Sequence, residues 1–549
     1  MTDQPISSNR VWVEAEFGGV CLGDKRRDAQ LLDAATAMAD QPSASNPERF
    51  DWNQLRSFYR TVDTPRAQPE ILQQTHRART RTRMSACLNR VLIVHDTTEV
   101  DFTDHPALHD ELGPIGTGEG VGLLQHNSLA FDPQARPMLG LIDQHMELRR
   151  PQPPHETRQQ RAWRPHKESE LWLKGFRGVG RVPSGSRWID VCDRGGDYFE
   201  ALQQSRQLGH EFLIRVCHDR RVSQSSRDEK TGAVVEPLQS LHATMRTISV
   251  ATTKVVSVVS RGGRPKREAT TCVGYTAVRL QPPQPDGHRR GMVSIPVTLI
   301  RVWEAGVEEA RAEAQRAKAD AKGAEKLVRA AVDTLAEVQK TATLAEPLKV
   351  AMAAEAAARI RWAEAKAIAK ERTNRAKEYL DWWLATSSPI RSIEDALEAV
   401  SDYEWRWPIA EEYHKVEKTG LRIEAQRFET AKRMLAALAI LSVVAIRILQ
   451  LRYARDEQPD ADAAQIATSE EIEMVANATK FQGDTMTVKR FVDGIARLGG
   501  YLGRKGDGPP GWRSLWLGYQ RLNDMIFGQR LSTGQPDGGS QRPRLPSSG

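Results

Sequence analysis

Two short apolar runs, each followed by an aspartate, constrain the fold of this chain more than any other feature. Val91–His95 precedes Asp96, and Trp188–Cys192 precedes Asp193. Runs of this length and composition predict buried strands. A helical pattern follows Asp193 and leads to a third apolar run, Phe212–Val216. The order strand, helix, strand predicts an α/β fold built around a sheet.

The two aspartates occupy equivalent positions, because each comes directly after a predicted strand. Ligands and catalytic groups of α/β sheets gather at the carboxyl ends of strands. Two carboxylates at that edge would form a hard-oxygen site suited to Mg²⁺ or Mn²⁺. An aspartate after a strand is also common as a helix cap or turn residue. Position alone therefore leaves both roles open for Asp96 and Asp193.

Further strand patterns lie between and after these runs. Residues 121–146 contain more strand-like pieces, and residues 249–303 alternate between apolar and polar side chains, which predicts antiparallel strands. Residues 305–377 are rich in Ala, Glu, Lys and Arg and predict two long helical arms separated at Pro347. A strand pattern resumes at 378–386, so this helical hairpin is inserted into a β-region.

Both ends of the chain predict helical domains. Residues 1–10 are polar and are expected to be disordered, and residues 11–75 place apolar side chains at helical spacing. A long apolar helix is expected over 421–453, and a further helical region over 470–528. The Gly-, Ser- and Pro-rich residues 529–549 predict a disordered tail.

Composition places the chain in a broad class. Its 549 residues are 40% hydrophobic and 27% charged, which is ordinary for a soluble protein. The five cysteines contain no CxxC pair, which argues against a disulfide framework or zinc ribbon and fits a reducing cytosol. The apolar run Met434–Ile446 is too short to span a bilayer, so we expect a core helix and no membrane contact. The net charge of +7 is compatible with a polyanionic partner without identifying one.

Three motifs resemble the signature boxes of the DDE transposases of bacterial insertion sequences. The first is Val94-His95-Asp96-Thr97-Thr98, and the second is Val191-Cys192-Asp193-Arg194. The third box consists of Tyr403, Arg406, Glu411 and Lys418. It resembles the branch with a tyrosine–arginine–glutamate–lysine motif, to which the cut-and-paste transposases of composite transposons belong. The resemblance extends to Leu22–Arg27 and to Leu498–Trp516.

This resemblance implies a domain plan. A ribonuclease-H-like catalytic domain is expected over 76–454, interrupted by a β-rich insertion at about 220–390 that carries the 305–377 hairpin. The helical domain of residues 1–75 would bind the DNA end, and residues 470–528 would form a dimerisation domain. The protein is then expected in the bacterial cytoplasm, associated with the nucleoid.

The third box departs from the family pattern in one respect. Four residues separate Arg406 from Glu411, where the family usually has three, whereas the six residues between Glu411 and Lys418 are as expected. Glu411 is therefore our choice for the third carboxylate, with Glu412 as the alternative, and the extra residue is expected at the start of the helix. In an α-helix, Glu411, Lys415 and Lys418 would share one face.

The resemblance also implies a reaction. Asp96, Asp193 and Glu411 would bind two Mg²⁺ ions, for which Mn²⁺ can substitute. Water would release a 3′-hydroxyl at the transposon end, the hydroxyl would attack the opposite strand to form a hairpin, and the reopened end would attack target DNA. The partners are double-stranded DNA, both transposon ends and target, and a second subunit in a synaptic dimer.

DNA contacts are expected at several positions. Near the cleavage point, phosphates would be met by Tyr403, Arg406, Lys418, Arg194 and Arg215. Trp382 and Trp407 match tryptophans that such enzymes place around a flipped base, although a tryptophan on a strand is more often core. The inverted repeat would be bound by Lys25, Arg26, Arg27, Arg56 and Arg60. Weaker candidates for a phosphate track are Arg77, Arg79, Arg81 and Arg83 on an extended segment, and Arg261, Arg264, Lys266 and Arg267 in a loop.

Several other interpretations remain open at this stage. A catalytically inactive DNA-binding derivative of a transposase would fit the extra residue before Glu411. A plain ribonuclease-H-like nuclease would share the carboxylates but would not need the two terminal domains. A structural helical protein dominated by 305–377 leaves the three acidic motifs unexplained. For the hairpin itself we expect a solvated arm, with contact to flanking DNA or another subunit as the alternative.

Overall fold

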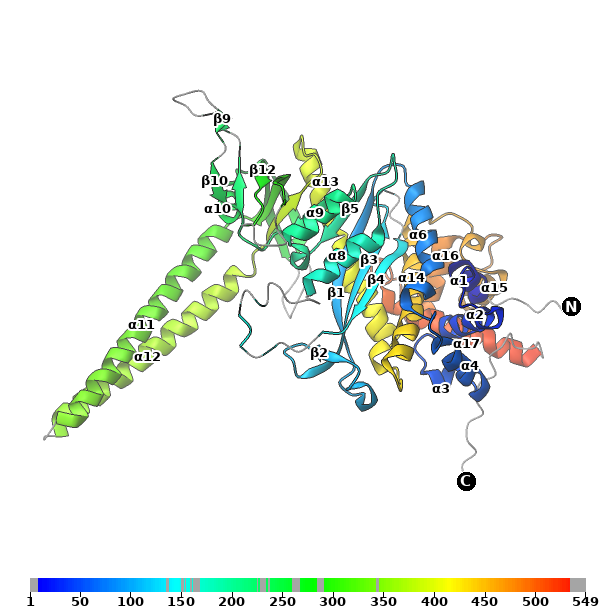
Figure 1. Cartoon of the computed structure of the whole chain (residues 1–549), viewed down its shortest axis with the longest axis horizontal. Coiled ribbons are helices and arrows are strands. Elements are labelled where there is room, and N and C mark those ends of the chain that lie inside the picture. The colour runs from blue at the N-terminus through cyan, green and yellow to red at the C-terminus, as the bar shows by residue number, and fades with distance from the viewer. Residues whose placement is uncertain are drawn as a thin grey trace. The chain divides into compact units, whose positions relative to one another are not determined.

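The computed structural model describes residues 8–134, 138–149, 153, 155–157, 160, 168–224, 226–227, 234–235, 237–258, 267–283, 291–341 and 345–533. The chain divides into two compact units. Unit 1 comprises Met1–Ile214 with Ser401–Gly549, and unit 2 comprises Arg215–Val400. The elements of each unit are shown in Figure 1.

Unit 1 begins with six helices, as the spacing of apolar residues predicts. They are α1 (Ser8–Phe17), α2 (Lys25–Asp40), α3 (Asn46–Arg49), α4 (Trp52–Val62), α5 (Pro69–Leu72) and α6 (Gln74–Ala86). Local caps fix their starts: the Asp24 side chain accepts from the backbone N–H of Arg26, and Asp51 forms a capping box with Gln54. The expectation of an irregular segment through residue 10 is wrong from Ser8 onward, where α1 begins.

A mixed sheet forms the centre of unit 1. Its strands are β1 (Val91–Asp101), β2 (Gly113–Ile115), β3 (Gly120–Phe131), β4 (Met138–Glu147), β5 (Trp188–Cys192) and β6 (Glu211–Arg215). β1 runs parallel to β5, and β5 parallel to β6, whereas β3 is antiparallel to β1, β2 and β4. The predicted strand, helix, strand order is thus confirmed, with α9 (Phe199–Gln207) between β5 and β6.

The first strand is longer than the sequence pattern indicates. β1 does not end at His95, because its pairing with β3 continues to Asp101 although its pairing with β5 stops at His95. Asp96 therefore lies within a strand rather than after one.

The two faces of this sheet carry different helices. Side chains alternate between the faces of a strand, and on β3 the ring of His126 lies 4.9 Å from that of Trp172 in α8 (Glu168–Val179). The neighbouring Asn127 accepts a hydrogen bond from Gln144 of β4, which also donates to Ser442 of α14 (Ala431–Glu457). Helix α8 thus covers one face, and α14 the other.

Helix α14 is the core helix of unit 1. It is the one helix among the described residues that is long and apolar enough to cross a membrane, but 83% of its apolar stretch is buried inside the protein. It packs against α2, α4 and α5 and against the C-terminal helices α16 (Val488–Leu498) and α17 (Trp512–Thr533). The core helix predicted at Met434–Ile446 is present, but it begins at Ala431 and not near residue 421, because the Thr430 side chain caps it there by accepting from the backbone N–H of Arg433.

The C-terminal helices are tied to the N-terminal ones. The hydroxyl of Tyr519 on α17 bonds Asn9 of α1 at 2.9 Å and Glu471 of α15 (Ser469–Thr479) at 3.1 Å. Helix α17 continues to Thr533, so the expected tail is helical at its start, and residues 534–549 lie outside the described part of the chain.

Unit 2 contains an antiparallel sheet, as the alternating pattern predicts. Its strands are β7 (Arg221–Ser223), β10 (Leu238–Ser240), β11 (Thr252–Val258), β12 (Arg267–Leu280), β13 (Ile295–Glu304) and β14 (Asp381–Thr386). They lie in the order β10-β7-β12-β13-β14, with β11 also pairing β12. A separate short pair is formed by β8 (Ser226–Arg227) and β9 (Val234–Val235). Helix α10 (Leu241–Thr247) contacts β10 and β13, and α13 (Ile393–Glu404) crosses the boundary between the two units.

A long helical hairpin interrupts unit 2 between β13 and β14. Its arms α11 (Val307–Thr341) and α12 (Ala345–Ala376) run side by side (Figure 1). Alanines fill much of their seam, and Ala314 and Ala369 are buried there. The predicted break at Pro347 is displaced, because Pro347 lies in the first turn of α12, where proline loses no helical hydrogen bond.

Candidate active site

The sheet brings Asp96 and Asp193 together. The parallel ladder between β1 and β5 runs from Val91 opposite Trp188 to His95 opposite Cys192. Asp96 and Asp193 are the next residues on the two strands, so they leave the ladder side by side. The pairing predicted from sequence is therefore present, even though β1 continues past it.

A tight turn fixes the Asp193 carboxylate. Its Oδ1 accepts a hydrogen bond from the backbone N–H of Gly195 at 2.6 Å and caps the short 3₁₀ helix Arg194–Gly196. A Cβ on Gly196 would lie 2.6 Å from the Cβ of Cys192, so the turn can close only with glycine there. Asp193 thus caps this turn through one of its two carboxylate oxygens.

The electrostatics around Asp96 favour a bound cation. Its side chain is only 13% exposed. Burial and the charge of Asp193 raise the pKa of Asp96 to about 7, and the Arg406 guanidinium opposes this rise. Two carboxylates in a poorly solvated place repel each other, and a divalent cation with oxygen preference is the ligand that relieves this repulsion. The donor set therefore fits Mg²⁺ or Mn²⁺.

A helix with wide turns follows Arg406. Residues Pro408–Tyr413 and Val416–Gly420 form π-helical turns, in which the N–H of His414 bonds the carbonyl of Ile409 and that of Leu421 bonds Val416. A π-turn holds one residue more than an α-turn. The fourth residue between Arg406 and Glu411 is accommodated in this way. The α-helical spacing assumed for Glu411, Lys415 and Lys418 does not apply across these turns.

Of the two candidate glutamates, the structure describes the side chain of Glu412 but not that of Glu411. The backbone of Glu411 belongs to the first π-turn, but its side chain lies outside the described part of the structure. The Glu412 carboxylate forms an ion pair with Arg452 of α14 and accepts a bond of 3.4 Å from the hydroxyl of Tyr453. Glu412 is therefore engaged with α14, and the assignment of Glu411 stays a prediction.

The side chain of His414 lies close to that of Asp96 and is hydrogen-bonded to Asn127. The Nδ1 of His414 lies 3.8 Å from Oδ2 of Asp96, and Asn127 donates to the His414 Nε2 at 3.1 Å. Burial, followed by the charges of Lys418 and Arg406, lowers the pKa of His414 to about 3. A neutral imidazole that accepts at Nε2 carries its proton on Nδ1, so an N–H faces Asp96.

A buried carboxylate joins this helix to the sheet. Gln125 of β3 donates to both oxygens of Glu417 at 2.9 Å, and the hydroxyl of Ser442 donates at 2.7 Å. Burial raises the pKa of Glu417 to about 7, although these hydrogen bonds work to lower it. This network was not predicted from the sequence. The sequence feature that indicates it is the polar run Gln125–Ser128 inside an otherwise apolar strand.

A second buried network holds β1 to β5 on the opposite face of the sheet. Asp190 bonds the Nε2 of His95 at 3.1 Å and the Nδ1 of His210 at 3.0 Å. All three side chains are fully buried. Because His95 and Asp96 point to opposite faces, this network fixes the strand that presents Asp96.

The predicted DNA contacts from the third box occupy varied environments. Tyr403 is buried, with 2% of its surface exposed. The guanidinium of Arg406 lies over the ring of Trp407 at 5.0 Å. Lys418 forms an ion pair with Glu424 at 3.0 Å. Arg194 is exposed beside Asp193. Trp382 on β14 and Arg215 belong to unit 2.

The cations predicted to bind the inverted repeat are exposed on two helices. Lys25, Arg26 and Arg27 form the first turn of α2, and Arg56 and Arg60 lie one turn apart on α4. Their placement leaves all five available to a polyanion.

The prediction that the alternating arginines Arg77, Arg79, Arg81 and Arg83 lie on an extended segment is wrong. Residues 74–86 form the helix α6 rather than an extended segment, and its arginines bind the protein itself. Arg77 pairs with Asp143 at 2.7 Å, Arg79 and Arg83 pair with Glu16 at 3.3 and 2.6 Å, and Arg81 donates to the Val179 carbonyl. Arg261, Arg264 and Lys266 lie outside the described residues, and Arg267 pairs with Glu304.

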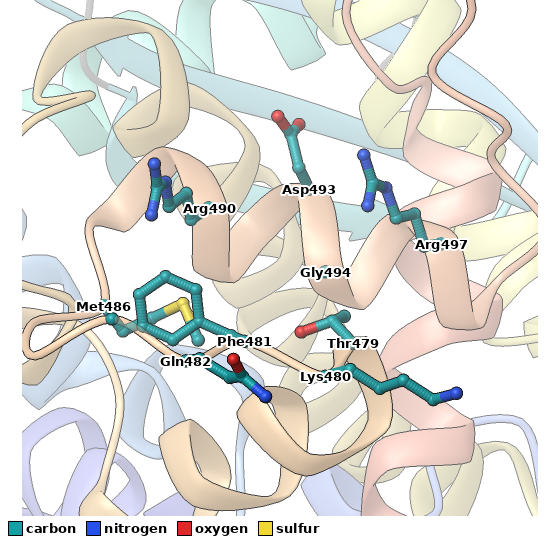
Figure 2. Close-up of a pocket in the computed structure, with 10 residues that line it drawn as sticks. Thr479, Lys480, Phe481, Gln482, Met486, Arg490, Asp493, Gly494 and Arg497 are labelled. Carbon is teal, nitrogen blue, oxygen red and sulfur yellow. The ribbon is translucent and has the colours of Figure 1, made fainter.

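A separate cavity of about 430 Å³ lies between α15 and α16. Figure 2 shows Arg490, Asp493 and Arg497 along one helix, with Lys480 and Phe481 on the neighbouring segment. Asp493 is paired with Arg455 at 2.5 Å, so its charge is already neutralised. The lining offers no pair of free carboxylates, and the chemistry of the chain is better sought at Asp96 and Asp193.

Comparison with known protein families identifies both ends of the chain. Residues 9–67, which include α2 and α4 with their exposed cations, match the family described as transposase DNA-binding. Residues 443–539 match the Tn5 transposase dimerisation domain. These two matches flank the aspartate pair and bear out the predicted terminal domains. The chain belongs to the Tn5 family of transposases, enzymes of the DDE class.

Proposed function

We propose that this transposase cuts DNA at the ends of its element and joins them to target DNA by a metal-dependent cut-and-paste reaction with a hairpin intermediate. The observation that carries the proposal is the side-by-side position of Asp96 and Asp193 at the end of the β1–β5 ladder. Phosphodiester cleavage and transfer can share one site, because each step is an in-line attack of an oxygen on phosphorus.

We assign the sheet of unit 1 to a ribonuclease-H-like core. Support comes from its mixed topology, in which antiparallel β3 and parallel β5 flank β1. The proposed plan places the end-binding domain at 1–75, the catalytic domain at 76–454 with its insertion at about 220–390, and the dimerisation domain at 470–528.

Asp96, Asp193 and Glu411 would hold two Mg²⁺ ions, which activate the attacking oxygen and neutralise charge on the phosphate. The protein's own part is to keep these carboxylates in place. The Gly195 N–H orients Asp193, and the His414–Asn127 pair supports Asp96 from behind. Arg406 lies close enough to lower the pKa of Asp96 and would bind a phosphate.

The remaining contacts follow the same scheme. Lys418, Arg194 and Arg215 would contact the phosphate backbone, whereas Tyr403 is too buried for such a contact. Trp382 and Trp407 would stack a flipped base. The exposed cations of α2 and α4 would bind the inverted repeat. Two subunits would synapse two ends through the C-terminal domain, in the bacterial cytoplasm.

The test compares the protein with its Asp193→Asn variant on labelled DNA that carries the flanks of its own gene. Cuts at the flank ends that require Mg²⁺ or Mn²⁺, and that Asp193→Asn and Glu411→Gln abolish, are the expected result. The exposed Asp110→Asn is the control and should cut normally. Specific binding without cutting under either metal would instead indicate an inactive DNA-binding derivative. Cutting without joining would indicate a plain nuclease.

A further inference from the structure

The helical hairpin of unit 2 carries two matching series of basic residues. On α11 they are Arg311, Lys318, Lys322 and Arg329, and on α12 Arg359, Lys366 and Lys370, continued by Lys377 just after the helix. In both series the residues are seven, four and seven positions apart. Steps of seven and four are close to two turns and one turn of an α-helix. Each series therefore forms a straight row along one face of its helix.

Both rows lie on the same edge of the hairpin. The opposite edge is marked by the ion pair between Glu313 of α11 and Arg372 of α12, at 3.0 Å. On α11 the buried seam at Ala314 lies between Glu313 and the row, since each residue advances about 100° around the helix. On α12 the buried Ala369 separates Arg372 from its row in the same way. The two rows therefore flank the seam together.

This edge holds an excess of positive charge. Lys318, Lys322 and Lys370 are exposed, and none makes an ion pair with a described residue. The Glu313–Arg372 pair sets the register of the antiparallel arms, which brings Lys318 level with Lys366 across the seam. Because both side chains are positively charged, Lys318 and Lys366 repel each other. Both rows are partly neutralised. Arg311 pairs with Asp381 at 2.5 Å, and Arg329 and Arg359 pair with glutamates one turn earlier, at Glu325 and Glu355.

We propose that this basic edge, the series Arg311–Arg329 and Arg359–Lys377, binds the phosphate backbone of duplex DNA without reading its sequence. A row of this length extends about 27 Å, the span of about eight base pairs. Between the cations lie exposed alanines such as Ala319, Ala363 and Ala367, which are too short to reach base edges. The arm therefore takes DNA of any sequence, such as target or flanking DNA, and leaves recognition of the ends to α2 and α4.

The test uses the full-length protein in EDTA and a labelled random 30-base-pair duplex. The variant Lys318→Gln/Lys322→Gln/Lys370→Gln removes three charges from the edge. The control Arg316→Gln/Arg361→Gln/Arg375→Gln removes three exposed charges from the other edge. Lost phosphate contacts lower the slope of log K against log salt by about 0.9 each. We expect the edge variant to lose about two to three units of slope and at least tenfold in affinity, while the control changes affinity by less than twofold.

Equal effects of the two variants would overturn the proposal. So would an unchanged DNA affinity accompanied by loss of a dimer in sedimentation, which would assign the edge to a second copy of the chain. Circular dichroism checks that both variants keep their helix content. The measurement needs no metal and no cleavage, so it is independent of the proposed reaction. The proposal depends on the proposed transposition reaction only where it names the DNA as target or flanking DNA.

Discussion

Glu412 forms an ion pair with Arg452, which ties the π-turned helix after Arg406 to the core helix α14. The Tyr453 hydroxyl bonds the same carboxylate, and both partners of the pair are less than a quarter exposed. A carboxylate held in this way contributes to stability and is not free to bind an ion. Of the two adjacent glutamates in the third box, Glu411 is therefore the one that we propose for the catalytic role.

The first prediction separates these glutamates. Glu412→Gln should lower the free energy of unfolding by about 1 kcal/mol, since it removes one partner of a partly buried pair, and leave cleavage within about threefold. Glu411→Gln should abolish cleavage at unchanged stability. Urea unfolding and a cleavage assay on the same preparations measure both. The reverse pattern would move the catalytic role to Glu412.

The second prediction concerns the π-turn. Deleting Ala410 should convert the wide turn to an α-turn, so that the residues on either side keep their phase, and the protein should fold and cut within about tenfold of normal. Deleting Ala437 from α14 is the control, because an α-helix rotates by about 100° for each lost residue and its buried face would turn outward. Thermal melting compares the two. Equal loss of folding would contradict this account of the turn.

The third prediction is a pH dependence from Glu16. Burial works to raise the pKa of Glu16, but its bonds with His76 and Arg83 prevail and lower it to about 2. The unfolded chain binds this proton more readily, so stability is complete above pH 4.5 and falls as the pH drops toward 2. Glu16→Gln should cost about 3 kcal/mol at pH 7 and flatten the acid limb of the stability curve. The more exposed Glu14→Gln should do neither.

The fourth prediction has the opposite sign. The raised pKa of Glu417, about 7, means that the folded protein binds a proton more readily than the unfolded chain. Its contribution is therefore complete below pH 4.5 and is lost as the pH rises through 7. Between pH 5 and 8.5 the wild type should lose up to about 3 kcal/mol of its free energy of unfolding, and the Glu417→Gln variant should not show this loss. If the free energy of unfolding changed with pH in the same way in variant and wild type, the Glu417 carboxylate would be charged throughout this pH range.

The sequence predicted those features that depend on local pattern. The strands of Asp96 and Asp193 were recognisable because buried parallel strands are apolar along their whole length, and the terminal helices because of their spacing. The length of β1 was not, since it is set by pairing with β3.

Features set by distant partners escaped the sequence analysis. Gln125 and Glu417 are far apart in the chain, and nothing in either segment indicates that they meet. The arginines of α6 alternate as an extended segment would, but their partners Glu16 and Asp143 hold them on a helix. The π-turn was visible only as one extra residue. The roles of Glu411 and Trp382 stay predictions.

The arm begins and ends at neighbouring points of one sheet. Trp303, next to the end of β13, is paired with Asp381, the first residue of β14, so the sheet closes whether the connection is long or short. Evolution can therefore lengthen, trim or exchange the arm as a module, at about 10 Å of reach for every seven residues added to each helix. Relatives with the same strands β13 and β14 could therefore differ in the length of this arm.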